Sequence, residues 1–295
     1  MFFSKFSIIL GSLVFLATPT GGPTFRGSAA FLYTKKAVSY GERPSGSEAI
    51  SRLREWIVSE LKPLKGELSL DSFTGQTPAG PVPMVNIIYK FSGSSGKAIA
   101  VSGHYDTKRI PMVHFVGAND GGSSTGFLLE FARTVSAMKH RDDIYIVFLD
   151  GEEAVATWTD TDSRYGSRHL AAKWLSEGVV PRIKALINID MIGDKNLDLS
   201  NDGNSSQALR NQVKQIAARL GDSKYFRSEE GGIEDDHLPF INAGVNAIDL
   251  IDLDFGPGNS YWHTAGDTID KLDAHSFQVV GDIVLQLVKE LDGQS

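Results

Sequence analysis

The stretch Asp143-Ile-Tyr-Ile-Val-Phe-Leu-Asp150, followed by Gly-Glu-Glu-Ala154, is the part of this sequence that decides the fold. Its apolar run predicts a buried strand, and Glu152 and Glu153 directly follow the end of that strand. Because successive residues point in different directions, one carboxylate can bind a metal ion while the other carries a proton beside it. Taken alone, the same residues are equally consistent with an acidic turn at a strand end.

Strand patterns and helix patterns alternate along the rest of the chain. Short apolar runs predict strands over 82–91, 98–103, 143–150, 183–190 and 247–251. Apolar residues at helical spacing predict helices over 47–61, 123–138, 165–176, 205–220 and 274–291. Since the central strands are continuously apolar, this alternation predicts an α/β fold whose largely parallel sheet is covered by helices on both faces.

The composition suits one globular domain. The 295 residues are 41% hydrophobic, and neither a repeat nor a long polar linker divides them. The formal net charge is −7 and the basic residues are scattered, which argues against a nucleic-acid partner because such a partner needs a basic patch. The chain has no cysteine, so a metal ion would be held by carboxylates and histidines.

The N-terminus is predicted to be a targeting segment. Lys5 precedes a short apolar run over 6–17, a pattern typical of a secretory signal peptide. The run is shorter than the roughly 20 residues of a comfortable membrane span. We therefore expect a signal peptide or N-terminal anchor over 1–22 and a single catalytic domain over 23–295. The protein would be periplasmic or secreted, with membrane contact only if the leader is retained.

Residues that can bind metals or move protons follow other predicted strands as well. His104 and Asp106 come directly after one strand, and Asp190 ends another. In parallel α/β sheets, ligands bind in the crevice beyond the carboxyl ends of the strands. We therefore expect these side chains to gather with the two adjacent glutamates at one edge of the sheet.

Two loops supply further candidates. Asp120 lies in the small-residue segment 117–126, where glycines let the chain pass close to a metal or substrate. On its own, this segment would be read as a simple turn and helix cap. His263 lies in a loop beside Trp262, and a lone loop histidine is more often structural than a ligand.

In chain order the candidates are His-x-Asp, Asp, Glu-Glu, Asp and His, an order that resembles the co-catalytic zinc aminopeptidase family. Each motif is weak alone, but the five separated motifs together are specific. The resemblance covers nearly the whole chain from about Ala29. It implies a three-layer α/β sandwich with a mixed, mostly parallel central sheet flanked by helices.

Three stretches resemble more narrowly the animal-type glutaminyl-peptide cyclotransferases, or glutaminyl cyclases. They are Asp150–Ala171 with Trp158, Glu234-Asp-Asp-His-Leu-Pro-Phe240, and Trp262-His-Thr264. The sequence also departs from that family, since it has no cysteine for the animal enzymes' disulfide. Glu234 stands where those enzymes tend to have glutamine, and the loop over 250–261 is longer and more acidic.

The resemblance implies conversion of an N-terminal glutamine to pyroglutamate with release of ammonia. It implies one zinc ion, and the implied zinc ligands are Asp120, Glu153 and His263. Glu152 would be the proton carrier beside the metal. The expected partners are peptide or protein N-termini that bear glutamine.

Four more residues are implied to act on the substrate. Asp190 and Asp235 would hydrogen-bond each other and the substrate amide during catalysis, while Trp158 and Trp262 would line the substrate pocket. Two close acids often share a proton, which would let one of them donate it.

Three residues remain ambiguous. His104 matches a histidine that binds the second zinc ion in two-metal aminopeptidases, where the counterpart of Asp190 also contributes; Asp106 lies two residues from His104, and His237 adjoins the acidic pair 235–236. All three are expected either to hold a second metal or to support the first site from behind. The alternative function is therefore a zinc aminopeptidase that hydrolyses N-terminal residues. A non-catalytic peptide-binding domain is a third hypothesis. It is disfavoured because the set of metal-ligand residues is complete.

Overall fold

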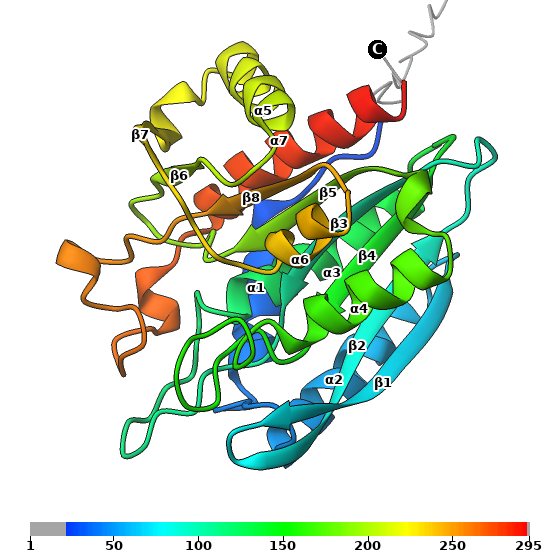
Figure 1. The fold of residues 1–295 in the computed structure, drawn as a ribbon. Coiled ribbons are helices and arrows are strands. Elements are labelled where there is room, and N and C mark those ends of the chain that lie inside the picture. Colours follow the sequence, from blue (N-terminus) through cyan, green and yellow to red (C-terminus); the bar gives the residue numbers. More distant parts are fainter. Residues whose placement is uncertain (1–21, 294–295) are drawn as a thin grey trace, which may run out of the picture.

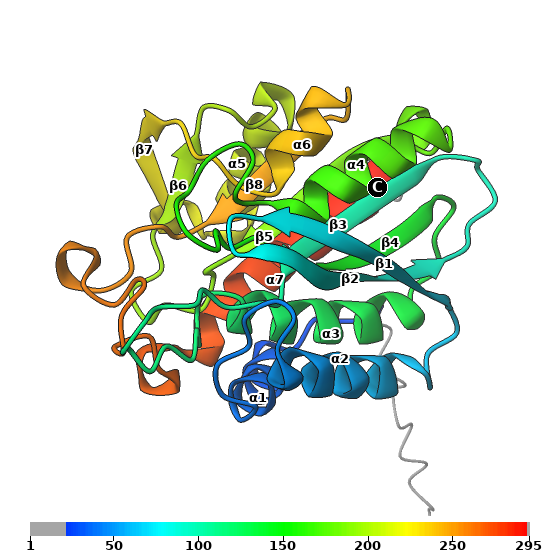
Figure 2. The same cartoon turned by 60° about the horizontal axis from the view of Figure 1, so that its bottom comes forward.

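A six-stranded sheet with helices on both faces forms the centre of the molecule (Figure 1 and Figure 2). The computed structural model describes residues 22–293. The strand order is β1-β2-β4-β3-β5-β8. This arrangement confirms the predicted α/β sandwich with a mixed, mostly parallel sheet. The leader predicted over 1–22 falls almost entirely outside the described residues.

Four parallel strands make up the buried part of the sheet. They are β3 (Ala98–His104), β4 (Asp143–Leu149), β5 (Ile183–Asp190) and β8 (Ala247–Ile251). Strand β3 lies between β4 and β5, and β8 pairs with β5. Every residue of β3, β4 and β8 is buried, as expected for strands that are covered on both faces. The carboxyl ends of all four strands therefore meet at one edge.

An antiparallel hairpin forms one side of the sheet. Strand β2 (Gly80–Phe91) pairs antiparallel with β4, and β1 (Glu67–Thr77) pairs antiparallel with β2. Sequence reasoning missed β1, because it is an edge strand with mostly exposed polar side chains and therefore has no apolar run.

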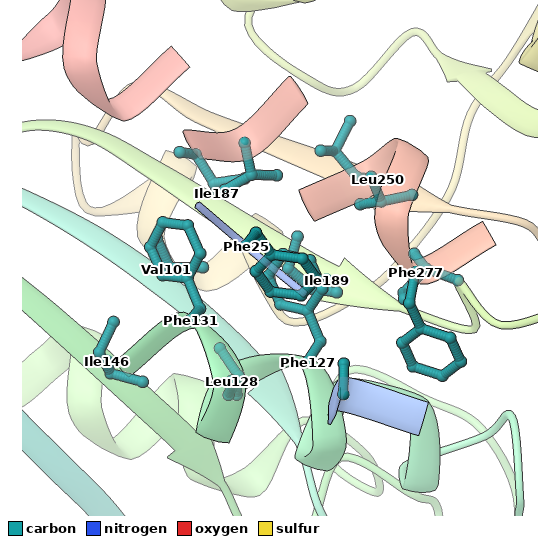
Figure 3. Packing of buried hydrophobic residues seen from close by; sticks show 14 of the residues in the cluster. Phe25, Val101, Phe127, Leu128, Phe131, Ile146, Ile187, Ile189, Leu250 and Phe277 are labelled. Carbon is teal, nitrogen blue, oxygen red and sulfur yellow. The ribbon is translucent and has the colours of Figure 1, made fainter. Parts of the chain in front are cut away.

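Five helices lie on the face of the sheet that carries the larger core. They are α1 (Gly27–Val38), α2 (Glu48–Leu61), α3 (Gly122–Ser136), α5 (Gln207–Leu220) and α7 (Ala274–Leu291). Figure 3 shows Phe25 packed against Phe127 and Phe131 of α3, close to Val101 of β3. Helix α2 begins where the hydroxyl of Ser47 accepts a hydrogen bond from the Ile50 backbone N–H, which caps the helix.

Two helices cover the opposite face. They are α4 (Tyr165–Ser176) and the short α6 (His237–Asn242). Trp174 packs between Tyr145 and Phe240, with ring centroids 5.2 and 5.8 Å away. Helix α6 leads directly out of the acidic stretch that precedes His237, so packing of this face positions part of the candidate site.

The remaining elements are short. A separate two-stranded parallel sheet consists of β6 (Leu199–Asp202) and β7 (Phe226–Gly231). Single 3₁₀ turns cover Val180–Arg182, Ser223–Tyr225, Pro257–Asn259 and Ile269–Lys271. No helix formed by residues 22–293 combines the length and the apolar character that a membrane crossing requires.

Candidate active site and metal centre

Three side chains from separate segments converge at the carboxyl edge of the sheet, and we call Asp120, Glu153 and His263 the front cluster. Nε2 of His263 lies 3.2 Å from Oδ2 of Asp120 and 3.2 Å from Oε1 of Glu153. One ligand atom of each residue lies within 4.8 Å of the other two. The two carboxylate oxygens are buried and make no well-formed hydrogen bond among the described residues.

The electrostatics of the front cluster fit a bound cation. Burial alone would lower the pKa of His263, but the carboxylates of Asp120 and Glu153 raise it to about 9. The two carboxylates therefore favour a positive charge at this position. A divalent cation can supply that positive charge instead, and two carboxylates with one imidazole are a donor set that suits zinc.

The backbone holds the loop of Asp120 tightly in place. Gly121 has φ of 78°, and a Cβ at this position would lie 2.3 Å from the carbonyl oxygen of Asp106. The carboxylate of Asp267 accepts hydrogen bonds from the backbone N–H groups of Asn119 and Asp120, at 2.7 and 3.1 Å. The glycines thus permit close contact with the neighbouring backbone. His263 itself has φ of 52°, which is uncommon for a residue with a side chain.

A second group of ligand type shares Asp120 with the front cluster. Nε2 of His104 lies 3.1 Å from Oδ1 of Asp190 and 3.2 Å from Oδ1 of Asp120. Asp106 lies behind this group and accepts hydrogen bonds from the backbone N–H groups of Glu152 and Glu153, at 3.1 and 3.3 Å. His104 is thus placed where it could hold a second ion, whereas Asp106 orients the glutamate turn.

A cavity of about 710 Å³ opens beside the front cluster, and we call it the main cavity. Its lining includes the other predicted site residues, namely Glu152, Trp158, Asp190, Asp235 and Trp262. Of the strand-end positions expected from the sequence, Glu152, Glu153 and Asp190 therefore border one space, whereas His104 and Asp106 do not line it.

Two acids of the main cavity, Glu152 and Asp190, have raised pKa values. Burial raises the pKa of Glu152 well above its usual range, and the nearby charge of Glu153 adds to this effect. Burial also raises the pKa of Asp190 to about 7, with a contribution from the charge of Asp235. Asp190 and Asp235 take different hydrogen-bond partners: Asp190 contacts His104, whereas Asp235 accepts a 2.8 Å hydrogen bond from Asn188.

The two predicted tryptophans lie on the walls of the main cavity. The ring of Trp262 stacks on the imidazole of His263, with centroids 4.1 Å apart. Nε1 of Trp158 donates a 3.2 Å hydrogen bond to Glu234, and the guanidinium of Arg164 lies over the Trp158 ring. The cavity thus combines a metal-type donor set, buried acids and aromatic walls.

Comparison with known proteins agrees with this arrangement. The profile of peptidase family M28 matches residues 86–288. The glutaminyl-peptide cyclotransferase of Drosophila melanogaster is 30% identical over 257 residues, which cover 78% of this chain and 72% of that protein. A glutaminyl cyclase from an Acidobacteriales bacterium superposes with a TM-score of 0.90 at 38% identity, covering 94% of this chain and 98% of that one.

The chain belongs to the glutaminyl-peptide cyclotransferases of peptidase family M28.

This family member is also similar to a solved peptidase structure. A Zn-dependent exopeptidase from Parabacteroides distasonis superposes with a TM-score of 0.80 at 28% identity, covering 91% of this chain and 99% of that chain. The fold is therefore shared by proteins described as cyclases and as peptidases, and the choice between the two reactions depends on the site.

His237 lies away from the main cavity, in what we call the rear cluster of Asp235, His237 and Asp249. Its ring is fully buried, with Nε2 3.1 Å from Asp202 and Nδ1 3.8 Å from Asp249. Asp235 joins the rear cluster to the main cavity because it lines that cavity, and the amide group of Asn188 donates to both Asp235 and Asp249. His237 thus belongs to the rear cluster and not to the cavity lining.

Sequence reasoning missed two residues that contact the front cluster. Nζ of Lys108 lies 3.1 Å from Oε2 of Glu153 and lines the main cavity. Asp267 holds the Asp120 loop through backbone N–H groups. Lys108 follows the predicted His104 motif closely enough to have been considered. No sequence motif marks Asp267, because its hydrogen-bond partners are backbone N–H groups that lie far away in the sequence.

Proposed function

We propose that this protein converts the N-terminal glutamine of peptides or proteins to pyroglutamate and releases ammonia. The observation that supports this most directly is the position of Glu152. It lines the main cavity beside the front cluster but does not belong to the cluster's ligand set. A carboxylate in that place is free to move protons next to the metal ligands.

We assign one zinc ion to Asp120, Glu153 and His263, whose donor atoms fit it as described above. A zinc ion bound there would polarise the γ-carbonyl of the substrate glutamine and stabilise the charge that develops on its oxygen, a contribution of several kcal/mol. Lys108, paired with Glu153, would hold the outer oxygen of that ligand in place.

Substrate folding is assigned to the aromatic walls. The α-amine and the γ-amide belong to the same residue, so the protein mainly has to bend the glutamine side chain back on itself. Trp158 and Trp262 line the main cavity and would confine the side chain in that bent form. This confinement also keeps water away from the reacting carbon.

Proton transfer is assigned to Glu152. The neutral α-amine attacks the γ-carbon. As the new C–N bond forms, the carboxylate of Glu152 takes the proton that the amine nitrogen loses. Glu152 then delivers this proton to the amide nitrogen, the old C–N bond breaks, and ammonia leaves. The raised pKa of Glu152 suits both steps, because the group must accept a proton and then donate it. General acid–base catalysis of this kind raises the rate by about 10²–10⁴-fold. Asp190 and Asp235 would hold the departing amide nitrogen.

The second candidate function is zinc aminopeptidase activity. The observation that favours it is the additional group of His104, Asp120 and Asp190, which shares a carboxylate with the front cluster as a two-metal site requires. In that reaction Glu152 would activate water, and the peptide bond after the first residue would break.

One incubation separates the two functions. A peptide with N-terminal glutamine is mixed with the purified protein and followed by mass spectrometry. Cyclisation removes the mass of one ammonia, whereas hydrolysis removes the whole first residue. Metal analysis of the same sample completes the test, because two tightly bound zinc ions per chain and release of the first residue would overturn the proposal.

We also propose that residues 23–295 form one catalytic domain that acts outside the cytoplasm after a signal peptide over 1–22. The extracytoplasmic assignment predicts that the mature protein, isolated from its native host, begins close to residue 23. N-terminal sequencing of that protein tests it, and a chain that still begins at Met1 would contradict it.

A further inference from the structure

A second hollow adjoins the main cavity. It has a volume of about 340 Å³ and lies between β7 and the segment that follows β8, and we call it the side groove. Figure 1 and Figure 2 both show β7 and this segment on the same side of the molecule. Gly232, Ile233 and Leu253 line the side groove and the main cavity alike. The two spaces therefore meet at these residues.

The side groove carries an excess of negative charge. Its charged lining residues are Arg227, Glu229, Glu230 and Asp254, which sum to −2 because three are acidic and one is basic. Arg227 is already bound by two carboxylates, at 2.8 Å from Asp254 and 2.7 Å from Asp198. Its positive charge is therefore compensated before any ligand arrives.

The acidic residues differ in how well they are neutralised. Glu230 forms a 2.5 Å ion pair with Arg210, which lies outside the groove lining. Glu229 is exposed, and no ion pair or hydrogen bond to its carboxylate is seen within residues 22–293. Glu234, in the main cavity near Ile233, shares Arg164 with Asp160. Glu229 and Glu234 thus leave negative charge at the groove and at its junction with the main cavity.

We infer that the side groove receives the residues that follow the N-terminal glutamine, and that it selects peptides with basic side chains at positions two to four. This inference rests on the proposed cyclase function, because it assigns the first residue to the main cavity. An extended chain covers about 10 Å in three residues, and the side groove adjoins the main cavity at their shared lining residues.

A different exit from the main cavity differs in its exposed charge: among its charged lining residues Asp106, Arg109 and Glu153, the two acids are buried and only the basic Arg109 is exposed. A cavity of about 280 Å³ lies near Arg109 and is joined to the main cavity only through Glu153 among their lining residues. Glu153 is a buried side chain of the front cluster. This cavity therefore shares fewer lining residues with the main cavity than the side groove does. A peptide that left by it would meet the exposed guanidinium of Arg109, and acidic side chains would be favoured.

The test measures kcat/KM for three amidated peptides that begin with glutamine and carry lysine, alanine or glutamate at positions two to four. At low salt the lysine peptide should exceed the glutamate peptide by about five- to ten-fold, since several exposed charge pairs each contribute modestly. The difference should appear mainly in KM. It should shrink towards one at about 1 M salt, where the screening length is about 3 Å.

Variants locate the effect. Glu229→Lys should bring the ratio between the lysine and glutamate peptides close to one, and Glu229→Asp should largely preserve it. Glu55→Lys is the matched control, because Glu55 is exposed on α2, on the other side of the sheet (Figure 2). That control should keep the preference of the unmodified protein.

The outcomes separate the two proposals. If none of the peptides loses ammonia, the cyclase function fails. If all three are cyclised equally well at low salt, the function stands and the side groove does not select charge. A preference for the glutamate peptide would assign the exit to the cavity near Arg109 and overturn the inference.

Discussion

The front cluster and the rear cluster have nearly the same chemistry but different surroundings. Each contains one histidine and two carboxylates whose ligand atoms lie within 4.8 Å of one another. The front cluster borders the main cavity of about 710 Å³, and the His263 side chain is 22% exposed. The rear histidine, His237, is fully buried and its Nε2 lies against Asp202.

The two clusters therefore share ligand types and spacing but differ in access to the main cavity. Burial raises the pKa of Asp249 well above its usual range, which favours the neutral form of this carboxyl group. Neither Asp249 nor His237 lines the main cavity, and only Asp235 of the rear cluster does. The front cluster keeps a donor set that faces a cavity, where a metal ion and a substrate can both arrive. We therefore expect metal only in front.

The largest effect should come from Asp120→Asn. Asp120 belongs to both ligand groups of the front cluster region, so its loss should reduce metal affinity by more than the 10- to 100-fold typical of groups that merely orient ligands, and turnover should become undetectable. Metal content per chain and the cyclisation assay measure the result.

Asp249→Asn is the matched control for this change. Because Asp249 does not line the main cavity and burial favours its neutral form, an amide of the same shape should preserve the metal content. Equal metal loss in both variants would remove the distinction between the front and rear clusters.

Glu152→Gln should have the next largest effect. The variant should bind metal normally, because Glu152 lies outside the ligand set, but turnover should fall by about 10²–10⁴-fold. Glu177→Gln, an exposed change at the end of α4, is the control. Near-normal turnover in Glu152→Gln would exclude this carboxylate from the mechanism.

Trp262→Ala should reduce activity about ten-fold. The substitution removes an aromatic pair with His263 that is worth roughly 0.5–1.5 kcal/mol and opens the wall of the main cavity. Steady-state kinetics should show a raised KM. Trp262→Phe keeps a stacked ring and should restore most of the activity; equal losses in both variants would mean that stacking is not the cause.

His237→Gln should have the smallest functional effect, because its metal content should not change. The free energy of unfolding of this variant should nevertheless fall by about 3–5 kcal/mol, because Asp202 loses a buried partner. Urea unfolding measures this loss, and His114→Gln is the control, since His114 is exposed and pairs with Glu42 at the surface. Loss of one metal equivalent from His237→Gln would place an ion in the rear cluster.

The same pair predicts a pH dependence. Burial opposes ionisation of Asp202, but hydrogen bonds from His237 and Ser205 lower its pKa to about 2, below the ordinary value of 3.8. A lowered pKa stabilises the folded state above the ordinary value, and this contribution is lost as the pH falls from about 4 to 2. The His237→Gln variant should show a shallower loss of stability over that range.

The sequence by itself determined the sheet and the identities of the ligand-type side chains. The continuous apolar runs of β3, β4, β5 and β8 predicted a buried parallel sheet, because strands covered on both faces must be apolar throughout. Since parallel strands end at one edge, Asp190 and the pair Glu152 and Glu153 could be placed together with the His104 motif. Polar edge strands such as β1 left no comparable pattern.

Only the tertiary structure decided which of these side chains face a common space. His237 follows an acidic pair and His263 follows a tryptophan, so both lie beside a recognisable motif. His237 is nevertheless buried against Asp202, whereas His263 faces the main cavity. Asp267 holds the Asp120 loop through backbone N–H groups that are 147 and 148 residues away. Such contacts depend on packing between distant segments, which local sequence patterns do not encode.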